Sequence, residues 1–409
     1  MKDESKINAT TMKTKATMSK RNSPQGLTLM ASTLLMLALA GTFTSLRGAV
    51  QGHEPKVHDI GVITLFDDPA GVAQIRVLEY VAEELNQNPS LKHRGRVAFH
   101  FADGGCDPDT ALNAYREFLN QGIHAFIGGL CSDETLGFAP FLEEDEAVAL
   151  NATSSSDDLA SISPNVKLLS YKNSALAQTI GAELCQLGAP VAILTEADGY
   201  TENLRDQVAA VLEGCGITPV ANVTFDSQTD LEALMTQVRA TGAESLFLNA
   251  VIIESGIGLL QAIEAVNWSP RPQLYGDLGV FVPAVLSSAP SVVPGMILAG
   301  SQPILTSEAC GILRDIEARH PGTLASLGSF YTWTTYQAGI LMGSLAVVHQ
   351  GDAGKIARAL STRTFKDAAG LSAAHGGNVY FGKEVFAQGV ETFAFTVQPD
   401  LSVEPPSCP

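Results

Sequence analysis

From residue 58 onward, short apolar stretches alternate with longer segments in which apolar residues recur every three or four positions. The short stretches predict strands, and the longer segments predict helices that bury one face. Successive strand–helix units favour parallel sheets, because each helix carries the chain back to begin the next strand in the same direction. The sequence therefore predicts an α/β protein.

The alternation occurs in two similar series and a shorter third part. The first series predicts strands at residues 58–65, 97–101, 125–128 and 147–150, with helices over 72–85 and 111–119 and from 134 onward. The second predicts helices at 175–187, 202–212, 231–240 and 258–265, alternating with strands at 191–194, 218–225, 245–248 and 273–275. The third predicts a strand at 296–300, helices at 308–319 and 331–348, and strands at 378–381 and 393–397.

Two such series, with too little chain left for a third domain, predict two doubly wound parallel-sheet lobes joined by a multi-strand hinge. We assign residues 51–172 and 300–365 to lobe 1, and residues 173–299 and 366–409 to lobe 2. Ligands of open parallel sheets bind outside the carboxyl ends of the strands. Two facing lobes therefore predict one cleft, in which closure about the hinge would bury a small molecule.

The first 50 residues have the pattern of an export signal. A polar segment with several Lys and Arg residues precedes an apolar run from Leu27 to Leu39, which is short for a membrane-spanning helix. Ala40 and Ala49 are alternative cleavage sites, and no Cys follows the run for lipid attachment. We expect export to the periplasm, removal of the signal peptide, and a chain that is not lipid-anchored.

The charge of the chain argues against two classes of partner. Residues 1–50 contain seven Lys or Arg and two Asp or Glu residues, so the rest carries 18 basic and 41 acidic residues, a net charge of −23. Phosphate backbones and anionic membrane surfaces would be repelled by such a chain. We expect neither nucleic acid nor membrane as a partner.

The sequence lacks the motifs that would indicate an enzyme. It has no GxSxG, HExxH, phosphate-binding loop or dinucleotide-binding fingerprint, and its eight His residues are scattered. We therefore expect a binding protein rather than an enzyme, with no cofactor and no metal.

Four segments carry a resemblance to a known family. They are Cys106-Asp107-Pro108, Gly128-Gly129-Leu130-Cys131-Ser132, Asn151-Ala152-Thr153-Ser154-Ser155 and Tyr331-Thr332-Trp333-Thr334-Thr335-Tyr336. In these segments, and over nearly all of residues 58–397, the chain resembles the periplasmic leucine/isoleucine/valine-binding proteins. The resemblance implies a type I periplasmic binding fold that delivers a small amino acid or related metabolite to the permease subunits of an ABC transporter.

Two further expectations concern partners. We expect a monomer, because delivery to a transporter needs an accessible cleft. A periplasmic sensor or regulator of the same fold, reporting to a membrane receptor or an envelope enzyme, is the alternative to a transport protein.

Candidate ligand-binding residues of lobe 1 follow predicted strands. Ser132 opens a helix whose first N–H groups lack internal partners, so hydroxyl and amides suit a carboxylate, although a simple helix cap is the alternative. The resemblance implies that Thr153 and Ser155 hold a ligand's carboxylate and amine; read alone, their loop is a solvated turn. Phe66 stands in a loop where the family has a Tyr.

Candidates of lobe 2 also follow strands. The resemblance implies that the ring of Tyr200 covers the ligand, and a half-buried Tyr at the rim is the alternative. Asn249 and Glu254 follow another strand, and Asp277 lies in a turn after the next. A carboxylate at this edge would pair with an ammonium group.

Three positions depart from the family. Leu278 replaces an acidic residue and Val251 an aromatic one, so the ligand's identity stays open, and Asp277, one position away, is a candidate substitute. Asp133 replaces a Ser in the first turn of a helix, where it stabilises the helix but places negative charge close to a ligand carboxylate. If Asp133 faces the cleft, we expect weaker binding of a simple zwitterion.

Six cysteines in an exported chain favour disulfides. The resemblance implies a Cys106–Cys131 bond that braces the ligand edge. Cys185, near one helix end, and Cys215, after the following helix, are a candidate second pair, which leaves Cys310 and Cys408 by elimination. The pairing of the last four stays open.

Overall fold

The computed structural model describes residues 55–301, 307–365 and 379–403. The expected signal peptide, with its cleavage sites, and Cys408 lie outside these residues. Within them, no helix combines the length and the hydropathy needed to cross a bilayer.

Lobe 1 is built on a parallel sheet of five strands in the order β2-β1-β3-β4-β5. The strands are β1 (Val57–Thr64), β2 (Arg96–Asp103), β3 (Ala125–Gly128), β4 (Val148–Asn151) and β5 (Val166–Leu168). The sequence predicted the first four. It missed β5, because three residues show no alternation.

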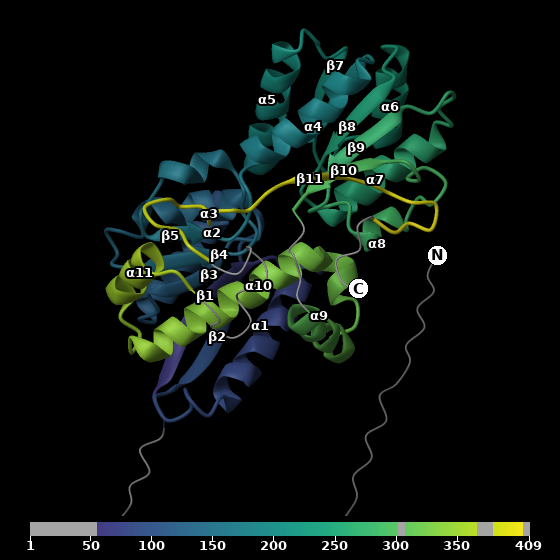
Figure 1. Ribbon diagram of the computed structural model, residues 1–409. Helices are drawn as coiled ribbons and strands as arrows, with labels where there is room; N and C mark the ends of the chain where they lie inside the picture. The colour runs from purple at the N-terminus through teal and green to yellow at the C-terminus, as the bar shows by residue number, and fades with distance from the viewer. Residues whose placement is uncertain (1–54, 302–306, 366–378, 404–409) are drawn as a thin grey trace, which may run out of the picture. The chain divides into compact units, whose positions relative to one another are not determined.

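Helices cover both faces of this first sheet (Figure 1). Alternate residues of β1 point to opposite faces, so Ile60 and Val62 pack on one side and Ile63 on the other. The helices α1 (Pro69–Gln87) and α10 (Thr323–Val348) lie side by side on the first of these faces. The other helices of the lobe are α2 (Pro108–Asn120), α3 (Ser132–Phe138), α9 (Ser307–Arg319) and α11 (Ala353–Thr362).

Lobe 2 is built on six strands in the order β11-β10-β9-β8-β6-β7, parallel except for β11. They are β6 (Val191–Glu196), β7 (Ala221–Phe225), β8 (Ser245–Asn249), β9 (Gln273–Asp277), β10 (Ile297–Gly300) and β11 (Phe393–Thr396). One face carries α4 (Asn173–Leu187) and α5 (Gly199–Gly214), and the other α6 (Leu231–Ala240), α7 (Ile253–Ala265) and α8 (Pro283–Leu286). The predicted α/β fold with two parallel-sheet lobes is confirmed.

The chain returns from lobe 2 to lobe 1 and back again. β10 belongs to the second sheet, α9 to α11 pack on the first, and β11 pairs with β10. Within the predicted strand at 378–381, Val379 forms only an isolated bridge with Phe365. Val379 and Phe381 are fully buried in the core of lobe 1, although the sequence boundaries place them in lobe 2. Their apolar character reflects this packing rather than strand pairing.

Two disulfides with both cysteines among the described residues connect the loops and helices of the lobes. Cys106 bonds to Cys131 with a Cα–Cα distance of 5.3 Å, as the resemblance implied. Cys185 bonds to Cys215 with a Cα–Cα distance of 6.2 Å, across the ends of α4 and α5. The candidate pairing of Cys310 with Cys408 lies outside the described residues.

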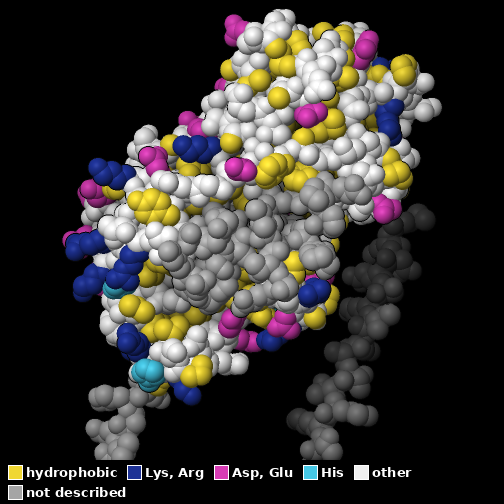
Figure 2. All heavy atoms as spheres, viewed as in Figure 1, with side chains coloured by type: hydrophobic (Ala, Val, Ile, Leu, Met, Phe, Trp, Pro, Cys, Tyr) yellow, Lys and Arg dark blue, Asp and Glu magenta, His cyan; other side chains and the backbone are white. Residues whose placement is uncertain are grey.

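Charged side chains of both signs lie on the surface. On the face that Figure 2 shows, Lys and Arg side chains are interspersed with Asp and Glu side chains and with apolar ones.

Candidate functional site

A cavity of about 60 Å³ lies between the strand ends of the two lobes. It is bounded by loops that follow β1, β3 and β4 in lobe 1 and β6, β8 and β9 in lobe 2, and by α10. Its lining comprises Leu65, Asp68, Ala70, Leu130, Cys131, Ser132, Thr153, Ser154, Ser155, Tyr200, Val251, Ile253, Asp277, Gly279, Val280, Leu327 and Tyr331. Carboxyl ends of parallel strands therefore meet from both sides, as the sheet-edge rule predicts.

Five of the eight ligand-binding candidates line this cavity. They are Ser132, Thr153, Ser155, Tyr200 and Asp277. Val251 also lines it, whereas Leu278 does not.

The other three candidates lie elsewhere. Phe66 is 44% exposed, and its backbone N–H donates a hydrogen bond to Asp103 at 3.3 Å. Asn249 is fully buried inside lobe 2, where its amide donates to the carbonyl oxygen of Thr201 at 2.7 Å. Glu254 is exposed in the first turn of α7. These residues lie at the carboxyl ends of strands, as the sheet-edge rule required, but they do not line the cavity.

Asn151, the last residue of β4, organises the lobe 1 side of the cavity. Its Oδ1 accepts hydrogen bonds from the backbone N–H groups of Thr153 and Ser154, both at 2.7 Å. Its Nδ2 contacts the carbonyl oxygens of Gly128 and Gly129 at the end of β3. This role was not predicted from the sequence, although an Asn followed by small polar residues is typical of a turn closed by the Asn side chain.

Ser132 connects the loops that follow β3 and β4. Its Oγ accepts hydrogen bonds from the backbone N–H groups of Ser155 and Ser156, both at 3.2 Å, so its hydroxyl hydrogen can still donate to a ligand. Thr153 donates from Oγ1 to the carbonyl oxygen of Leu130 at 2.8 Å. The hydroxyls of this edge thus hold the loops together as well as facing the cavity.

Replacing Ser132 with Ala is expected to weaken ligand binding by about tenfold and to lower the free energy of unfolding by about 1–3 kcal/mol. The variant removes a hydroxyl from the cavity and leaves two buried N–H groups without their acceptor. Calorimetric titration and denaturant unfolding measure the two effects. Ser156→Ala is the control, because Ser156 caps the following turn and does not line the cavity. Equal affinities of the Ser132→Ala variant and the unmodified chain would remove Ser132 from the binding site.

Glu134 and the first disulfide fix the same edge. Glu134 is fully buried in α3 and accepts hydrogen bonds from the backbone N–H groups of Cys131, at 3.0 Å, and Cys106, at 3.3 Å. Burial raises the pKa of Glu134 to about 7. One carboxyl group thus holds both halves of the disulfide beside the cavity.

Asp277 is the buried carboxylate of the cavity. Its oxygens accept hydrogen bonds from the hydroxyls of Tyr171, at 3.1 Å, and Tyr200, and from the backbone N–H of Gly279 at 2.8 Å. Burial raises its pKa, against these hydrogen bonds, and no Lys, Arg or His is among the described residues that line the cavity. A buried carboxylate with hydroxyl donors but no cation is suited to an ammonium group.

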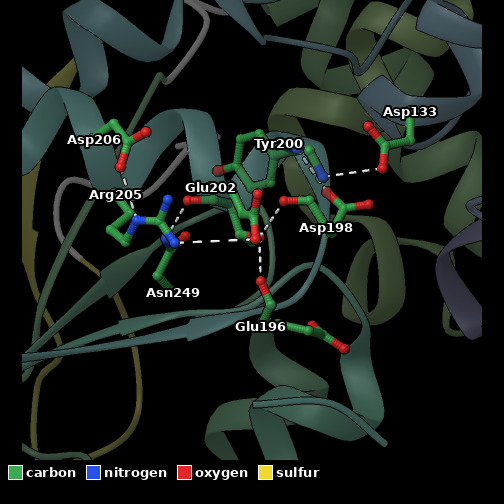
Figure 3. Close-up of polar contacts among 10 residues, drawn as sticks. Asp133, Glu196, Asp198, Tyr200, Glu202, Arg205, Asp206 and Asn249 are labelled. Atoms are coloured by element: carbon green, nitrogen blue, oxygen red, sulfur yellow. Dashed lines mark hydrogen bonds and ion pairs between the residues drawn. The ribbon is translucent and has the colours of Figure 1, made fainter. Parts of the chain in front are cut away.

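Two carboxylates of lobe 1 reach the helix N-termini of lobe 2. Figure 3 shows the first of them, Asp133. Asp133 accepts a hydrogen bond from the backbone N–H of Gly199, the first residue of α5, at 3.0 Å. Asp68 caps α1 and also accepts from the backbone N–H of Ile253, the first residue of α7, at 3.4 Å. Negative charge is stabilised at such positions. Asp133 therefore lies on the contact between the lobes.

Acidic residues of lobe 2 surround the same helix ends. Asp198 caps α5 by accepting from the backbone N–H of Tyr200 at 2.8 Å. Burial, followed by the charges of Asp133 and Glu196, raises the pKa of Asp198 to about 8. Glu196 accepts from the backbone N–H of Val251, at 2.8 Å, just before α7. The sequence did not identify Asp68, Glu196 or Asp198, because their roles depend on which loops meet.

In the part of the chain that the structure describes, no group of three or more His, Cys, Asp or Glu side chains is placed to hold a metal ion.

Comparison with known proteins identifies relatives of this chain. A family model described as periplasmic binding protein matches residues 60–392. A leucine-, isoleucine-, valine-, threonine- and alanine-binding protein of Pseudomonas aeruginosa is 24% identical over 176 residues, 40% of this chain and 45% of that protein. An amino acid binding protein of the same organism is 22% identical over 246 residues, 58% of this chain and 64% of that protein. Both matches span less than two thirds of the relatives' length.

Solved structures share the fold. A leucine binding protein from Thermotoga maritima has a TM-score of 0.70 at 16% identity, covering 85% of this chain and 97% of that one. A solute binding protein of an ABC transporter from R. palustris, in complex with 4-hydroxybenzoate, has a TM-score of 0.71 at 15% identity, covering 84% and 93%. A type 1 periplasmic binding protein from Bordetella pertussis Tohama I has a TM-score of 0.73 at 17% identity, covering 86% and 100%.

Proposed function

The chain belongs to the periplasmic binding protein family, and from this premise we propose that it captures a small amino acid or a related amine between its lobes and delivers it to an ABC transporter. Proteins of this family bind their substrates and do not transform them. We further propose that the chain is exported to the periplasm, loses its signal peptide and acts as a monomer.

Asp277 is the observation that carries this proposal. Its carboxylate is buried at the lobe 2 edge of the cavity, between two tyrosine hydroxyls and a backbone N–H, with no basic residue among the lining. Ser132 and Thr153 line the lobe 1 edge of the same cavity, where the hydroxyl of Thr153 already donates to Leu130 and that of Ser132 can still donate. An amino acid meets both edges, because its ammonium fits a carboxylate and its carboxylate fits the hydroxyl donor of Ser132.

A ligand that is only an anion fits this lining less well. One structural neighbour holds 4-hydroxybenzoate, which has no amino group. Here the carboxylates of Asp68 and Asp277 both line the cavity without a basic side chain, and a buried anion beside them would be repelled. The two P. aeruginosa relatives, whose names describe amino acid binding, support the amine-bearing class.

A thermal-shift screen tests the proposal on the purified exported chain. Alanine, valine, leucine and threonine are compared with benzoate and 4-hydroxybenzoate. A ligand at about 100 times its Kd stabilises the folded form by about 2.7 kcal/mol, which raises the melting temperature. We expect a shift with at least one amino acid.

Two modified ligands sharpen the test. N-acetyl-L-leucine lacks the ammonium, and L-leucinamide lacks the carboxylate. Ammonium recognition by Asp277 predicts that acetylation abolishes the shift and that leucinamide retains part of it. A shift with the benzoates alone would contradict the proposal.

A further inference from the structure

The amino ends of the lobe 1 strands lie at the edge of the sheet opposite the cavity, because the cavity lies at the carboxyl ends of parallel strands. Three described segments meet at this edge. They are residues 55–59 at the start of β1, residues 88–96 between α1 and β2, and residues 348–363 from the end of α10 to the residue after α11. We call the surface that they form the basal surface.

Hydrogen bonds join the three segments of the basal surface. The backbone N–H of Arg96 donates to the carbonyl oxygen of Lys56 at 2.8 Å. Nζ of Lys56 donates to the carbonyl oxygen of Gln350 at 3.0 Å, and Nε2 of Gln350 donates to the carbonyl oxygen of Arg94 at 3.5 Å. Segments that are far apart in the sequence therefore form one continuous surface.

The basal surface is basic, although the chain is acidic. Its segments contain seven Lys or Arg and two Asp residues, a net charge of +5, whereas residues 51–409 carry 18 basic and 41 acidic residues. All seven basic residues are exposed, and among the described residues only Lys355 of the seven has an ion-pair partner, Asp352 at 2.7 Å. Figure 2 shows Lys and Arg side chains gathered at the lower left, over this end of lobe 1. The surface is therefore suited to an anionic partner.

Exposed apolar side chains accompany these charges. Val57 is 47% exposed at the start of β1, and Val348 is 41% exposed at the end of α10. Cations beside apolar side chains suit an anionic phospholipid surface, because the cations attract the headgroups and the apolar groups enter the interface. The net charge of the chain led us to expect no membrane partner. At physiological ionic strength, however, exposed charges more than about 8 Å apart are largely screened from each other, so the local charge decides.

The order of the chain favours a membrane over other polyanions. The expected signal has no charged residue between Arg21 and Arg47, as suits insertion into a bilayer. Residues 47–56 link this segment to β1 and span at most about 35 Å when fully extended. Before the signal is cleaved, the basal surface therefore lies close to phospholipid headgroups.

We propose that the basal surface binds the anionic phospholipid headgroups of the membrane and holds the exported chain at the leaflet. The cavity lies at the opposite edge of the lobe 1 sheet, so a ligand can enter it while the basal surface is bound. This contact goes beyond ligand capture and does not depend on which ligand is captured.

Co-sedimentation of the purified exported chain with vesicles tests the basal surface. Vesicles of phosphatidylcholine alone are compared with vesicles that also contain about 30% phosphatidylglycerol. We expect binding to the anionic vesicles only, and its loss in about 0.5 M NaCl, which screens the attraction. Lys92→Gln combined with Arg94→Gln should weaken this binding by at least about tenfold, because each cation beside an anionic leaflet contributes to affinity.

Arg116→Gln combined with Arg314→Gln is the matched control. It changes the net charge by the same amount at exposed positions of α2 and α9, outside the basal surface. We expect this control to bind anionic vesicles as the unmodified chain does. Both double variants should fold normally by circular dichroism and keep their affinity for the ligand.

The outcomes separate this proposal from the proposed function. Equal binding to the two kinds of vesicle, binding to neither, or an equal loss in the control variant would overturn the membrane contact. Binding of duplex DNA without binding of anionic vesicles would assign the surface to another polyanion and would overturn it as well. Because the vesicle assay needs no ligand, each of these results leaves the proposed function standing. Failure of the thermal-shift screen, in turn, leaves the basal surface standing.

Discussion

Replacing Asp277 with Asn is expected to lower the affinity for an amino acid by about 100-fold, which corresponds to about 3 kcal/mol. Asn has nearly the same shape, and its amide oxygen can keep the hydrogen bonds from Tyr171 and Gly279, which share one carboxylate oxygen. Its NH2 group then faces the hydroxyl of Tyr200, which accepts instead of donating. The charge that would meet the ligand's ammonium is lost. Calorimetric titration with the best amino acid of the screen measures the effect.

Glu254→Gln is the matched control for Asp277→Asn. Both substitutions turn an acid into its amide at the same edge of lobe 2, but Glu254 is exposed and does not line the cavity. We expect its affinity to equal that of the unmodified chain. If the Asp277→Asn variant binds as tightly as the unmodified chain, the carboxylate is not the ammonium anchor.

The pH dependence of binding follows from the same carboxyl group. Burial raises the pKa of Asp277, and an ammonium ligand binds the ionised form. Affinity should therefore be full at high pH and should fall as the pH drops through that raised pKa, at a higher pH than for an ordinary Asp. The Asp277→Asn variant should lack this dependence.

Replacing Gly199 with Ala is expected to weaken ligand binding by more than about tenfold, because the substitution breaks a contact between the lobes. A Cβ atom at Gly199 would lie 2.0 Å from Oδ1 of Asp133, so the carboxylate must leave the N–H that it accepts from at 3.0 Å. Calorimetric titration measures affinity, and small-angle scattering in excess ligand should give a larger radius of gyration than for the unmodified chain.

A double-mutant cycle tests whether the contact with Asp133 accounts for the loss of affinity in the Gly199→Ala variant. Asp133→Ser removes the side chain that the new methyl group would meet, so Gly199→Ala should have a much smaller effect in that background. Denaturant unfolding checks that both lobes stay folded. An equal loss of affinity in both backgrounds would show that Gly199 acts through the helix rather than through Asp133.

The fold was predictable because parallel sheets repeat one pattern. Strands such as β3 and helices such as α6 have the bounds that periodicity gave, since buried strands between amphipathic helices leave an unambiguous pattern. Val379 and Phe381 did not follow the prediction, because their apolar side chains fill the core of lobe 1 from a segment that pairs with no full strand. Periodicity cannot distinguish these two reasons for burial.

The sequence predicted site residues within each lobe, but not the contacts between the two lobes. The sheet-edge rule and the resemblance indicated Ser132 and Asp277, which line the cavity. Asn249 ends a strand in the same way, but its side chain faces the interior of lobe 2. The roles of Asp68 and Asp133 depend on helices that begin more than sixty residues away in the chain, in the other lobe, and no local pattern carries that information.

The carboxylates of Asp68 and Asp133, in lobe 1, bind the N-termini of two helices of lobe 2. The two halves are therefore complementary to each other before any guest arrives. A ligand therefore needs to contribute less free energy to hold the two lobes together, so more of the free energy of its own contacts contributes to its affinity. As a consequence, the arrangement of the lobes differs less with and without ligand. A partner protein that binds only the liganded form must therefore recognise it through the loops around the ligand.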